Sequence, residues 1–432
     1  MRKTNPSRRT FIRSAALTAG ALGIGGLIPS RVLGANDRIR FGLIGTGGMG
    51  TGHLQSLLGR SSDDNIQVGG ICDVYQRRVN RSLAACGKAG HRAEGYLDYR
   101  KLLDNKDIDA VLIATPDHWH STISIAAMDA GKHVYCEKPM TLTVEQAIEV
   151  RNAVRKYKKV FQVGPNYTAE DQFWKARDII RGGRIGKVTW AQGSYNRNVK
   201  GCAFNMWNPI DETAGPDKTG EDYIDWDMWL GSKWNLAPKI PWNPEHFFRF
   251  RKYWPYNGGV ATDLLYHKLA PLLLTIVGPN GEYPSQVNAN GGLYIEKDGR
   301  DIPDVFMMSV SYPSEFTVNL ISVLTNDTQM PTRIFGKYGT MELDKQAVMT
   351  ENGDFTGEFR SLNNGYSQVS IPKAETRDME GNFIDVIRTG GQLYCNAELG
   401  AATMVAIKMG VESYKQKKTL LWDSVNSKLI NT

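Results

Sequence analysis

IRFGLIGTGGMG, residues 39–50, decides the fold of the first part of the chain. Ile39–Ile44 is a mostly apolar run, as expected of a buried strand, and Gly45–Gly50 fits the pattern G-x-G-x-x-G. A second short apolar run, Val68–Cys72, ends just before Asp73, which lies 23 residues past Gly50. A strand, a glycine turn, a helix, a second strand and an acid in this order indicate a dinucleotide-binding site.

The same stretch predicts how the nucleotide is held. Glycines allow a tight turn and let the backbone approach a pyrophosphate at the positive N-terminus of the following helix. Asp73 can accept hydrogen bonds from the adenosine ribose, and its charge would repel a 2′-phosphate, which favours NAD over NADP. Arg77 and Arg78 weaken this preference slightly, because either could reach a phosphate. In this stretch the residues predicted to contact the nucleotide are Gly45, Thr46, Gly47, Gly48, Met49, Gly50, Asp73 and Arg78.

Further along, the pattern changes near residue 165. Before it, the apolar runs 110–114, 133–136 and 160–163 alternate with helical patterns, which predicts a parallel sheet covered by helices. After it, strand-like runs are bounded by Gly, Pro, Asn or Asp, which predicts an antiparallel sheet. These runs are 188–195, 286–295, 305–312, 316–324, 332–336 and 340–343, with helices expected at 170–181, 261–276, 379–388 and 398–416. The predicted class is α/β, with a Rossmann domain at 36–164 and an α+β domain at 165–432.

Residues 1–35 are predicted to be a signal peptide. Ser7–Arg13 resembles the twin-arginine export signal, and the weakly apolar stretch Ala15–Ile28 is, at about 14 residues, too short to span a bilayer. We therefore expect export by the twin-arginine translocase, cleavage near Ala35 and a soluble periplasmic or otherwise exported protein. The segment carries six of the basic residues and no acid, so its removal lowers the net charge from +7 to +1. That balance argues against a nucleic-acid partner.

Two clusters of polar residues follow neighbouring predicted strands. Thr115–His120 closes one strand and Glu137-Lys138-Pro139 closes the next, at the edge where an open α/β sheet binds its ligand. Lys138 would emerge beside the nicotinamide, where burial and a cationic ring pull its pKa toward neutrality. Asp263 and His267 are spaced i, i+4 on a predicted helix and share one face, so the carboxylate could orient the imidazole. No metal site is predicted, because the five cysteines form no C-x-x-C pair.

These motifs together resemble the Gfo/Idh/MocA oxidoreductases, from about Asp37 to the end of the chain. The resemblance rests on the glycine pattern, Thr-Pro followed by Trp-His, Glu-Lys-Pro, and Gly-Gly before Asp-x-x-x-His. It implies a Rossmann domain followed by a large, open, mostly antiparallel sheet, which is a plausible homo-oligomer surface. It also implies that Lys138 orients the reacting hydroxyl and that His267, with Asp263, is the general base. The residues implied along the cofactor are Thr115, Pro116, Trp119, His120, Glu137 and Lys138.

Two features depart from this resemblance. Many members carry an arginine soon after the position of Gly164, whereas this chain has Pro165–Thr168. An insert at 196–257 holds six of the ten tryptophans, and indole faces suit the C–H faces of sugar rings. A hydrophobic cover or a subunit contact is nearly as good an interpretation of the insert. His118 and His246 are expected to be surface or loop residues.

The expected function is an exported NAD-dependent oxidoreductase acting on a secondary ring hydroxyl of a sugar or glycoside. Because the periplasm has no free NAD pool, the cofactor would be loaded before export, held tightly and recycled by a second sugar. One alternative is a redox glycosidase that oxidises, eliminates and reduces again. Another is a non-catalytic sugar-binding protein, against which Lys138, Asp263 and His267 count.

Overall fold

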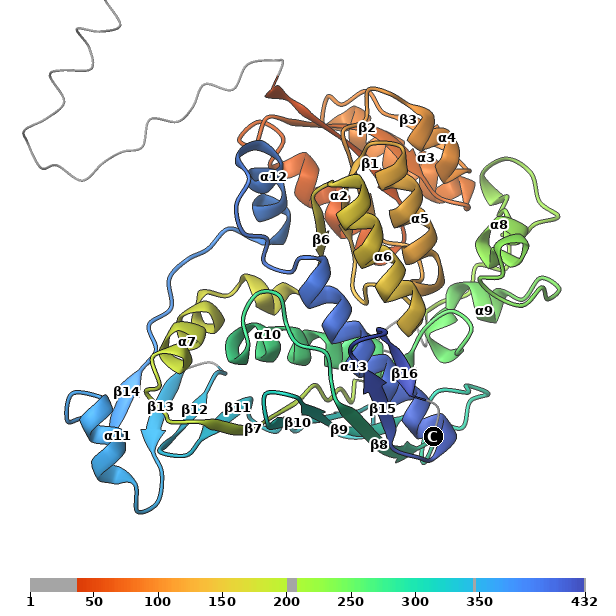
Figure 1. Ribbon diagram of the computed structural model, residues 1–432. Coiled ribbons are helices and arrows are strands. Elements are labelled where there is room, and N and C mark those ends of the chain that lie inside the picture. The colour runs from red at the N-terminus through yellow and green to blue at the C-terminus, as the bar shows by residue number, and fades with distance from the viewer. Residues whose placement is uncertain (1–36, 200–207, 345–346, 431–432) are drawn as a thin grey trace, which may run out of the picture. The chain divides into compact units, whose positions relative to one another are not determined.

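The computed structural model describes residues 37–199, 208–344 and 347–430 (Figure 1). The predicted signal peptide and Trp207 of the insert lie outside these residues. Ile39–Thr432 form one compact unit. Of the helices within the described ranges, none combines the length and apolar character needed to cross a membrane.

The first sheet is parallel throughout and has the strand order β3-β2-β1-β4-β5-β6. Its strands are β1 (Ile39–Ile44), β2 (Ile66–Cys72), β3 (Glu94–Tyr96), β4 (Ala110–Ile113), β5 (His133–Cys136) and β6 (Phe161–Val163). The helices between them are α2 (Gly48–Gly59), α3 (Gln76–Lys88), α4 (Tyr99–Asp104), α5 (Asp117–Asp129) and α6 (Val144–Tyr157). The predicted parallel sheet is confirmed. β3 escaped prediction because its three residues, Glu-Gly-Tyr, form no apolar run.

The second sheet has ten strands in the order β14-β13-β12-β11-β7-β10-β9-β8-β15-β16. They are β7 (Val188–Ser194), β8 (Gln286–Gly292), β9 (Val305–Tyr312), β10 (Phe316–Val323), β11 (Arg333–Gly336), β12 (Gly339–Glu342), β13 (Val348–Glu351), β14 (Gln368–Ser370), β15 (Leu420–Asp423) and β16 (Lys428–Ile430). Its pairs are antiparallel except β7 with β10. The predicted fold class is confirmed, and the one parallel pair makes this sheet mixed.

From α12 onward, near its C-terminal end, the chain returns to the first sheet. From α12 (Met379–Thr389), the Phe383 ring packs edge-on against Phe41 and Tyr135, with ring centroids 6.2 and 5.8 Å apart. The Val163 N–H donates to the Cys395 carbonyl over 3.0 Å. α13 (Ala397–Gln416) then contacts α6, α10 (Tyr266–Ile276) and β8 (Figure 1). These contacts fix the ends of the first-sheet strands against the second sheet.

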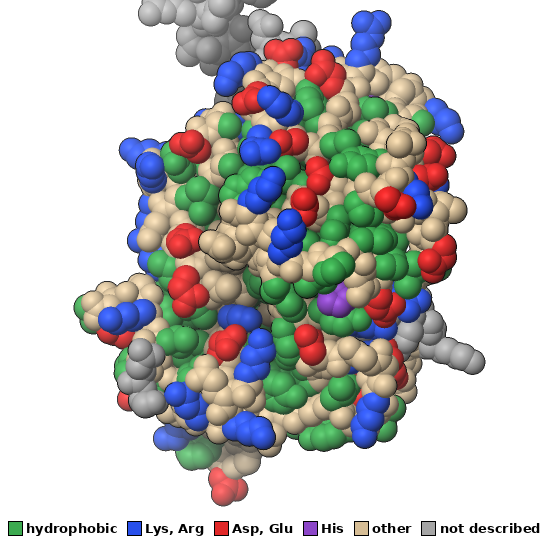
Figure 2. All heavy atoms as spheres, turned by 90° about the vertical axis from the view of Figure 1, so that its right-hand side faces the viewer, with side chains coloured by type: hydrophobic (Ala, Val, Ile, Leu, Met, Phe, Trp, Pro, Cys, Tyr) green, Lys and Arg blue, Asp and Glu red, His purple; other side chains and the backbone are tan. Residues whose placement is uncertain are grey.

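The described part of the insert has a small core of its own. Trp226, Trp229 and Phe247 are buried in it with other apolar side chains, and Tyr75, which lies between β2 and α3, joins them. Its short helices are α8 (Trp226–Leu230) and α9 (Pro244–Phe248), and Figure 2 shows the face of the molecule on this side. Among the insert's tryptophans within the described residues, only Trp229 lines the main cavity. The remainder therefore fit the hydrophobic-cover interpretation better than direct sugar stacking.

Candidate active site

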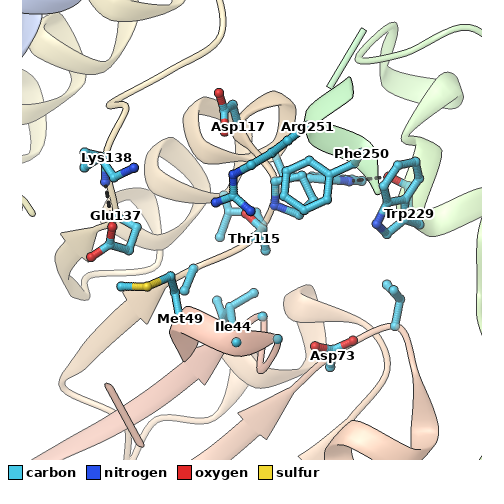
Figure 3. Close-up of a pocket in the computed structure, with 18 of the residues that line it drawn as sticks. Ile44, Met49, Asp73, Thr115, Asp117, Glu137, Lys138, Trp229, Phe250 and Arg251 are labelled. Carbon is cyan, nitrogen blue, oxygen red and sulfur yellow. Dashed lines mark hydrogen bonds between the residues drawn. The ribbon is translucent and has the colours of Figure 1, made fainter. Parts of the chain in front are cut away.

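A cavity of about 530 Å³ lies at the carboxyl ends of β1, β2, β4 and β5. The glycine turn, Asp73, Thr115 and Glu137 line it from the first sheet, and His267 lines it from α10. The insert contributes further walls, including Trp229, Phe250 and Arg251 (Figure 3). The predicted site residues therefore gather around one space, with the exceptions of Thr46, Gly50, His120 and Asp263, which lie behind its surface.

The glycine turn has the geometry of a pyrophosphate cradle. Gly45 has φ +87°, and a Cβ there would lie 2.8 Å from the backbone of Ala114. A Cβ at Gly50 would lie 1.9 Å from the Gly45 carbonyl oxygen, so the turn closes only with glycine at both positions. α2 begins at Gly48 without a side-chain cap, and a Cβ at Gly48 would meet no atom within 4 Å. The helix N-terminus is thus open toward the cavity, as an anion site requires.

Asp73 is held rigidly at the end of β2. Its carboxylate accepts hydrogen bonds from the Thr46 N–H over 2.7 Å and from the Tyr75 N–H over 3.0 Å. It lines the cavity, whereas Thr46 is fully buried behind the turn. Arg78 Nη1 lies 3.9 Å from Asp73 and also lines the cavity. Arg77 instead pairs with Asp211 and Asp222 of the insert.

Lys138 reaches across the cavity to the second part of the fold. Its Nζ donates to Asp263 Oδ1 over 3.1 Å and to the Asp263 carbonyl over 3.0 Å. Arg251 Nε donates to the other carboxylate oxygen over 2.6 Å. Burial alone would raise the pKa of Asp263, but the charges of Arg251 and Lys138 lower it below its usual value. One buried carboxylate therefore holds two cations, of which sequence reasoning found only Lys138.

His267 lies in an aromatic setting rather than against a carboxylate. Its ring packs edge-on against Tyr167 and Tyr195, with centroids 5.9 and 5.7 Å apart. Burial and the charge of Lys138 lower the pKa of His267 to about 3. Among the described residues no hydrogen bond joins it to Asp263, whose oxygens bond Lys138 and Arg251. The i, i+4 spacing predicted that pairing, but Asp263 lies in the π-helical turn 261–265 that precedes α10, and two stronger donors compete for it.

Asp117 is a site residue that the sequence analysis missed. It lines the cavity at the first turn of α5 and accepts a hydrogen bond from Asn257 Nδ2 over 2.9 Å. Burial and the charge of Asp263 raise its pKa to about 7. The only sequence signal was its place directly after Thr115-Pro116.

The two histidines that were expected to be surface or loop residues, His118 and His246, have other environments in the structure. His118 is fully buried, and its Nε2 lies 2.9 Å from the Trp229 carbonyl oxygen, so that prediction was wrong. His246 is half-buried in α9 and stacks on Tyr253 with centroids 3.9 Å apart. The insert explains both corrections, because it covers the start of α5 and forms its own core.

Trp119 and His120, which the resemblance places along the cofactor, have different positions in the structure. Trp119 lines the cavity and donates its Nε1–H to the Trp229 carbonyl over 2.8 Å. The ring nitrogens of His120 lie 2.7 and 2.9 Å from the carbonyl oxygens of Pro139 and Thr115. His120 thus ties together the turns after β4 and β5 instead of facing the cavity.

Glu137 belongs to a buried charged chain behind Lys138. His53 Nε2 lies 2.8 Å from Glu137 Oε1, and His53 Nδ1 lies 2.6 Å from Glu380 Oε1. Burial alone would lower the pKa of His53, but its two carboxylate partners raise it to about 10. The doubly bonded imidazolium links α2, the end of β5 and α12. Sequence reasoning missed it, since the three residues are far apart in the chain.

Comparison with known proteins places this geometry in a family context. Residues 39–165 match the family model described as "Oxidoreductase family, NAD-binding Rossmann fold", that of Gfo/Idh/MocA. A glycosyl hydrolase family 109 protein of Saccharopolyspora erythraea is 28% identical over 226 residues, which cover 47% of this chain and 49% of the relative. An inositol 2-dehydrogenase of Salmonella typhimurium is 30% identical over 158 residues, 36% of this chain and 46% of the relative. The chain thus spans about half the length of these curated relatives.

Solved structures with the same fold extend over most of the chain. The WlbA dehydrogenase of Chromobacterium violaceum, in complex with NADH and UDP-GlcNAcA, superposes with a TM-score of 0.63 at 17% identity, covering 90% of this chain and 97% of that one. The aldose-aldose oxidoreductase of Caulobacter crescentus gives 0.62 at 18% identity, covering 89% and 99%. At these identities the likeness concerns the fold. Together with the glycine turn and Asp73, the family-model match shows that residues 39–165 resemble the NAD-binding Rossmann domain of the Gfo/Idh/MocA oxidoreductases.

Proposed function

We propose that the protein is an exported NAD-dependent oxidoreductase that oxidises a secondary ring hydroxyl of a sugar or glycoside, or reduces the corresponding ketone. One observation carries this proposal: Lys138 and His267 line the same cavity as the glycine turn and Asp73. The dinucleotide, when bound, supplies the exchange of a hydride with the reacting carbon. The glycine turn would hold its pyrophosphate and Asp73 its adenosine ribose, and the negative charge of Asp73 favours NAD over NADP.

Lys138 is suited to position the hydroxyl that reacts. An ammonium group has three N–H donors, and two of those on Lys138 point to Asp263. One donor is left for a substrate oxygen in the cavity. Because Asp263 is buried and is also held by Arg251, the Lys138 ammonium has a fixed place before substrate arrives.

His267 is suited to receive the hydroxyl proton. Its lowered pKa keeps the imidazole neutral at working pH, so one ring nitrogen can accept a proton. A pKa of about 3 also means that His267 holds this proton poorly. Asp117, with a pKa of about 7, lines the same cavity and can hold a proton at neutral pH. We assign Asp117 the role of proton reservoir for the site.

A second candidate reaction uses the same site. A transient ketone would acidify a neighbouring carbon-bound proton and expel a glycosidic group before reduction restores the alcohol. The similarity to glycosyl hydrolase family 109 proteins favours this redox glycosidase. The glycosidase would restore its nucleotide within each turnover, and the oxidoreductase would restore it by reducing a second sugar. Either cycle suits an exported enzyme without a free NAD pool.

The test is to purify the exported protein, extract its nucleotide and analyse products from a panel of free sugars and glycosides. We expect bound NAD(H) and interconversion of a sugar with its keto form. Release of a free sugar from a glycoside, with no net change in nucleotide redox state, would instead select the glycosidase. Bound nucleotide with no product from any substrate would favour a non-catalytic sugar-binding protein.

We further propose that the protein is a homo-oligomer that pairs through the open face of the ten-stranded sheet. Along β9 the residues alternate, with Phe306, Met308 and Val310 buried beneath α13 and Met307 exposed on the other face. Trp190 is exposed as well and stacks on Phe335 at 3.8 Å. Light scattering of the purified protein tests this, and a monomer at micromolar concentration would exclude it.

A further inference from the structure

We propose that the described part of the insert, residues 208–257, retains the bound dinucleotide by closing the adenosine end of the cavity and fastening itself to residues 74–78. This inference rests on the nucleotide binding proposed above. It assigns the aromatic insert to cofactor retention, and it names Tyr75, Arg77, Asp211 and Asp222 as the residues that keep the insert closed.

The insert forms the outer wall of the adenosine end. Met228, Trp229, Phe247 and Phe248 line the same cavity as Asp73. Figure 3 shows Trp229 and Phe250 on one side of the cavity, with Asp73 and Ile44 on the other. A nucleotide held by Asp73 and the glycine turn would therefore have aromatic side chains of the insert on its opposite side.

Charged side chains fasten this wall to the turn that follows Asp73. Tyr75 Oη donates to Asp211 Oδ2 over 2.8 Å, and the Arg77 guanidinium pairs with both Asp211 and Asp222. Asp211 thus accepts from Tyr75, which precedes α3, and from Arg77 in the first turn of α3. The Arg78 guanidinium lies over the rings of Tyr75 and Phe247, 5.6 and 5.2 Å from their centroids.

Backbone hydrogen bonds reinforce the same contact. The Gln76 N–H donates to the Tyr223 carbonyl over 3.0 Å, and the Asp225 N–H donates to the Val74 carbonyl over 2.9 Å. These two bonds lie immediately beside the charged pairs. The insert therefore contacts residues 74–78 through both backbone and side-chain hydrogen bonds. We call this contact the seam.

The buried core of the insert takes part in the same contact. Ile224, Trp226, Leu230 and Tyr256 are buried with the aromatic wall residues in one cluster. Tyr75 belongs to this cluster and Val74 packs against it, so the seam at residues 74–78 joins the insert by apolar packing as well as by charged pairs. Since affinity differences between related complexes arise mainly in the dissociation rate, loss of the seam should speed nucleotide release.

The experiment compares NADH release from the full-length exported protein and from the double variant Asp211→Asn/Asp222→Asn. Each protein is loaded with NADH, mixed with excess NAD⁺, and followed by the loss of bound NADH fluorescence. We expect release from the double variant to be about 10-fold faster or more. The matched control is Asp217→Asn, because exposed Asp217 pairs only with its neighbour Lys218 within the insert. Its release rate should equal that of the unmodified protein.

Equal release from the double variant and the unmodified protein would overturn the inference while leaving nucleotide binding intact. Failure of the unmodified protein to bind NADH would overturn the proposed function, and the inference with it. Near-ultraviolet circular dichroism checks that the double variant is folded. If it is not, Arg77→Gln removes the same charged pairs from the other side, and unchanged release from this variant would also refute retention by the insert.

Discussion

Lys138 Nζ donates two hydrogen bonds to Asp263, one to its carboxylate over 3.1 Å and one to its backbone carbonyl over 3.0 Å. The two residues are 125 positions apart in the chain. The contact brings the end of β5 to the turn before α10. It thereby connects the nucleotide-binding sheet with the part of the cavity that holds His267. The place of the Lys138 ammonium therefore depends on both parts of the fold.

Lys138→Ala and His267→Ala should each lower turnover by about 10²–10⁴-fold, because one removes the group that positions the reacting hydroxyl and the other the group that receives its proton. Bound nucleotide should remain, because the pyrophosphate cradle is backbone of the glycine turn. Lys138→Arg should fail too, since a planar guanidinium cannot reproduce the ammonium geometry at Asp263. Steady-state rates and nucleotide content per protein are the measurements.

The matched control for these variants is Lys156→Ala, which changes an exposed lysine on α6. Its rate should equal that of the unmodified protein. Near-normal rates in both cavity variants would show that Lys138 and His267 are structural. Loss of rate together with loss of nucleotide would assign them to binding instead.

Asp73→Ala should loosen NAD(H) strongly. Two hydrogen bonds from ribose hydroxyls to a carboxylate contribute about 3–6 kcal/mol together. Nucleotide content after extensive dialysis and a titration with NADH measure the loss. Asp63→Ala, at an exposed acid of the same sheet region, is the control. Copurification of NADP(H) alone would contradict the assignment of Asp73.

Arg8→Lys with Arg9→Lys should block export and leave full-length protein in the cytoplasm. The prediction rests on the match of Ser7–Arg13 to the twin-arginine signal. Cell fractionation and the mass of the recovered protein are the readouts, with Arg2→Lys as a control outside the motif. Processed protein recovered from the periplasm in normal amount would refute the signal.

The parts that could be predicted from the sequence are those with a local pattern. The glycine turn, the strands of the parallel sheet and the places of Asp73 and Lys138 follow from short motifs and apolar runs. Each depends on residues close together in the chain, where sterics and periodicity act directly. His267 was found by its spacing, but the partner expected for it was wrong.

What escaped prediction depends on contacts between distant segments. Arg251 comes from an insert that carries no recognisable pattern, yet it shares Asp263 with Lys138. His53 and Glu380 are 327 positions apart and meet only because α12 returns to the first sheet. The burial of His118 likewise depends on the insert, which covers the start of α5.

Thermal stability should fall as pH rises toward 10 because of His53. Its pKa in the folded protein is about 10, above the ordinary value of 6.5. The stabilisation from its bonds with Glu137 and Glu380 is thus complete below about pH 6.5 and is lost as pH rises through about 10. His53→Gln should lower the melting temperature at pH 6, since breaking a buried ion pair costs about 3–5 kcal/mol. It should also flatten the decline between pH 7 and 10. An equally steep decline in this variant would assign the effect to other groups.

Asp117 should set the pH dependence of sugar oxidation. Burial and the charge of Asp263 raise its pKa to about 7, while Arg251, Lys138 and the bond from Asn257 oppose the rise. Above pH 7 its carboxylate can take up the proton that His267 releases, so kcat/KM for oxidation should increase through pH 7 and then level off. Asp117→Asn should abolish this inflection and lower the plateau. Asp129→Asn, at the exposed end of the same helix, should leave the profile unchanged. The inflection would have to belong to another group if the Asp117→Asn profile still rose through pH 7, and the proton-reservoir role would then be wrong.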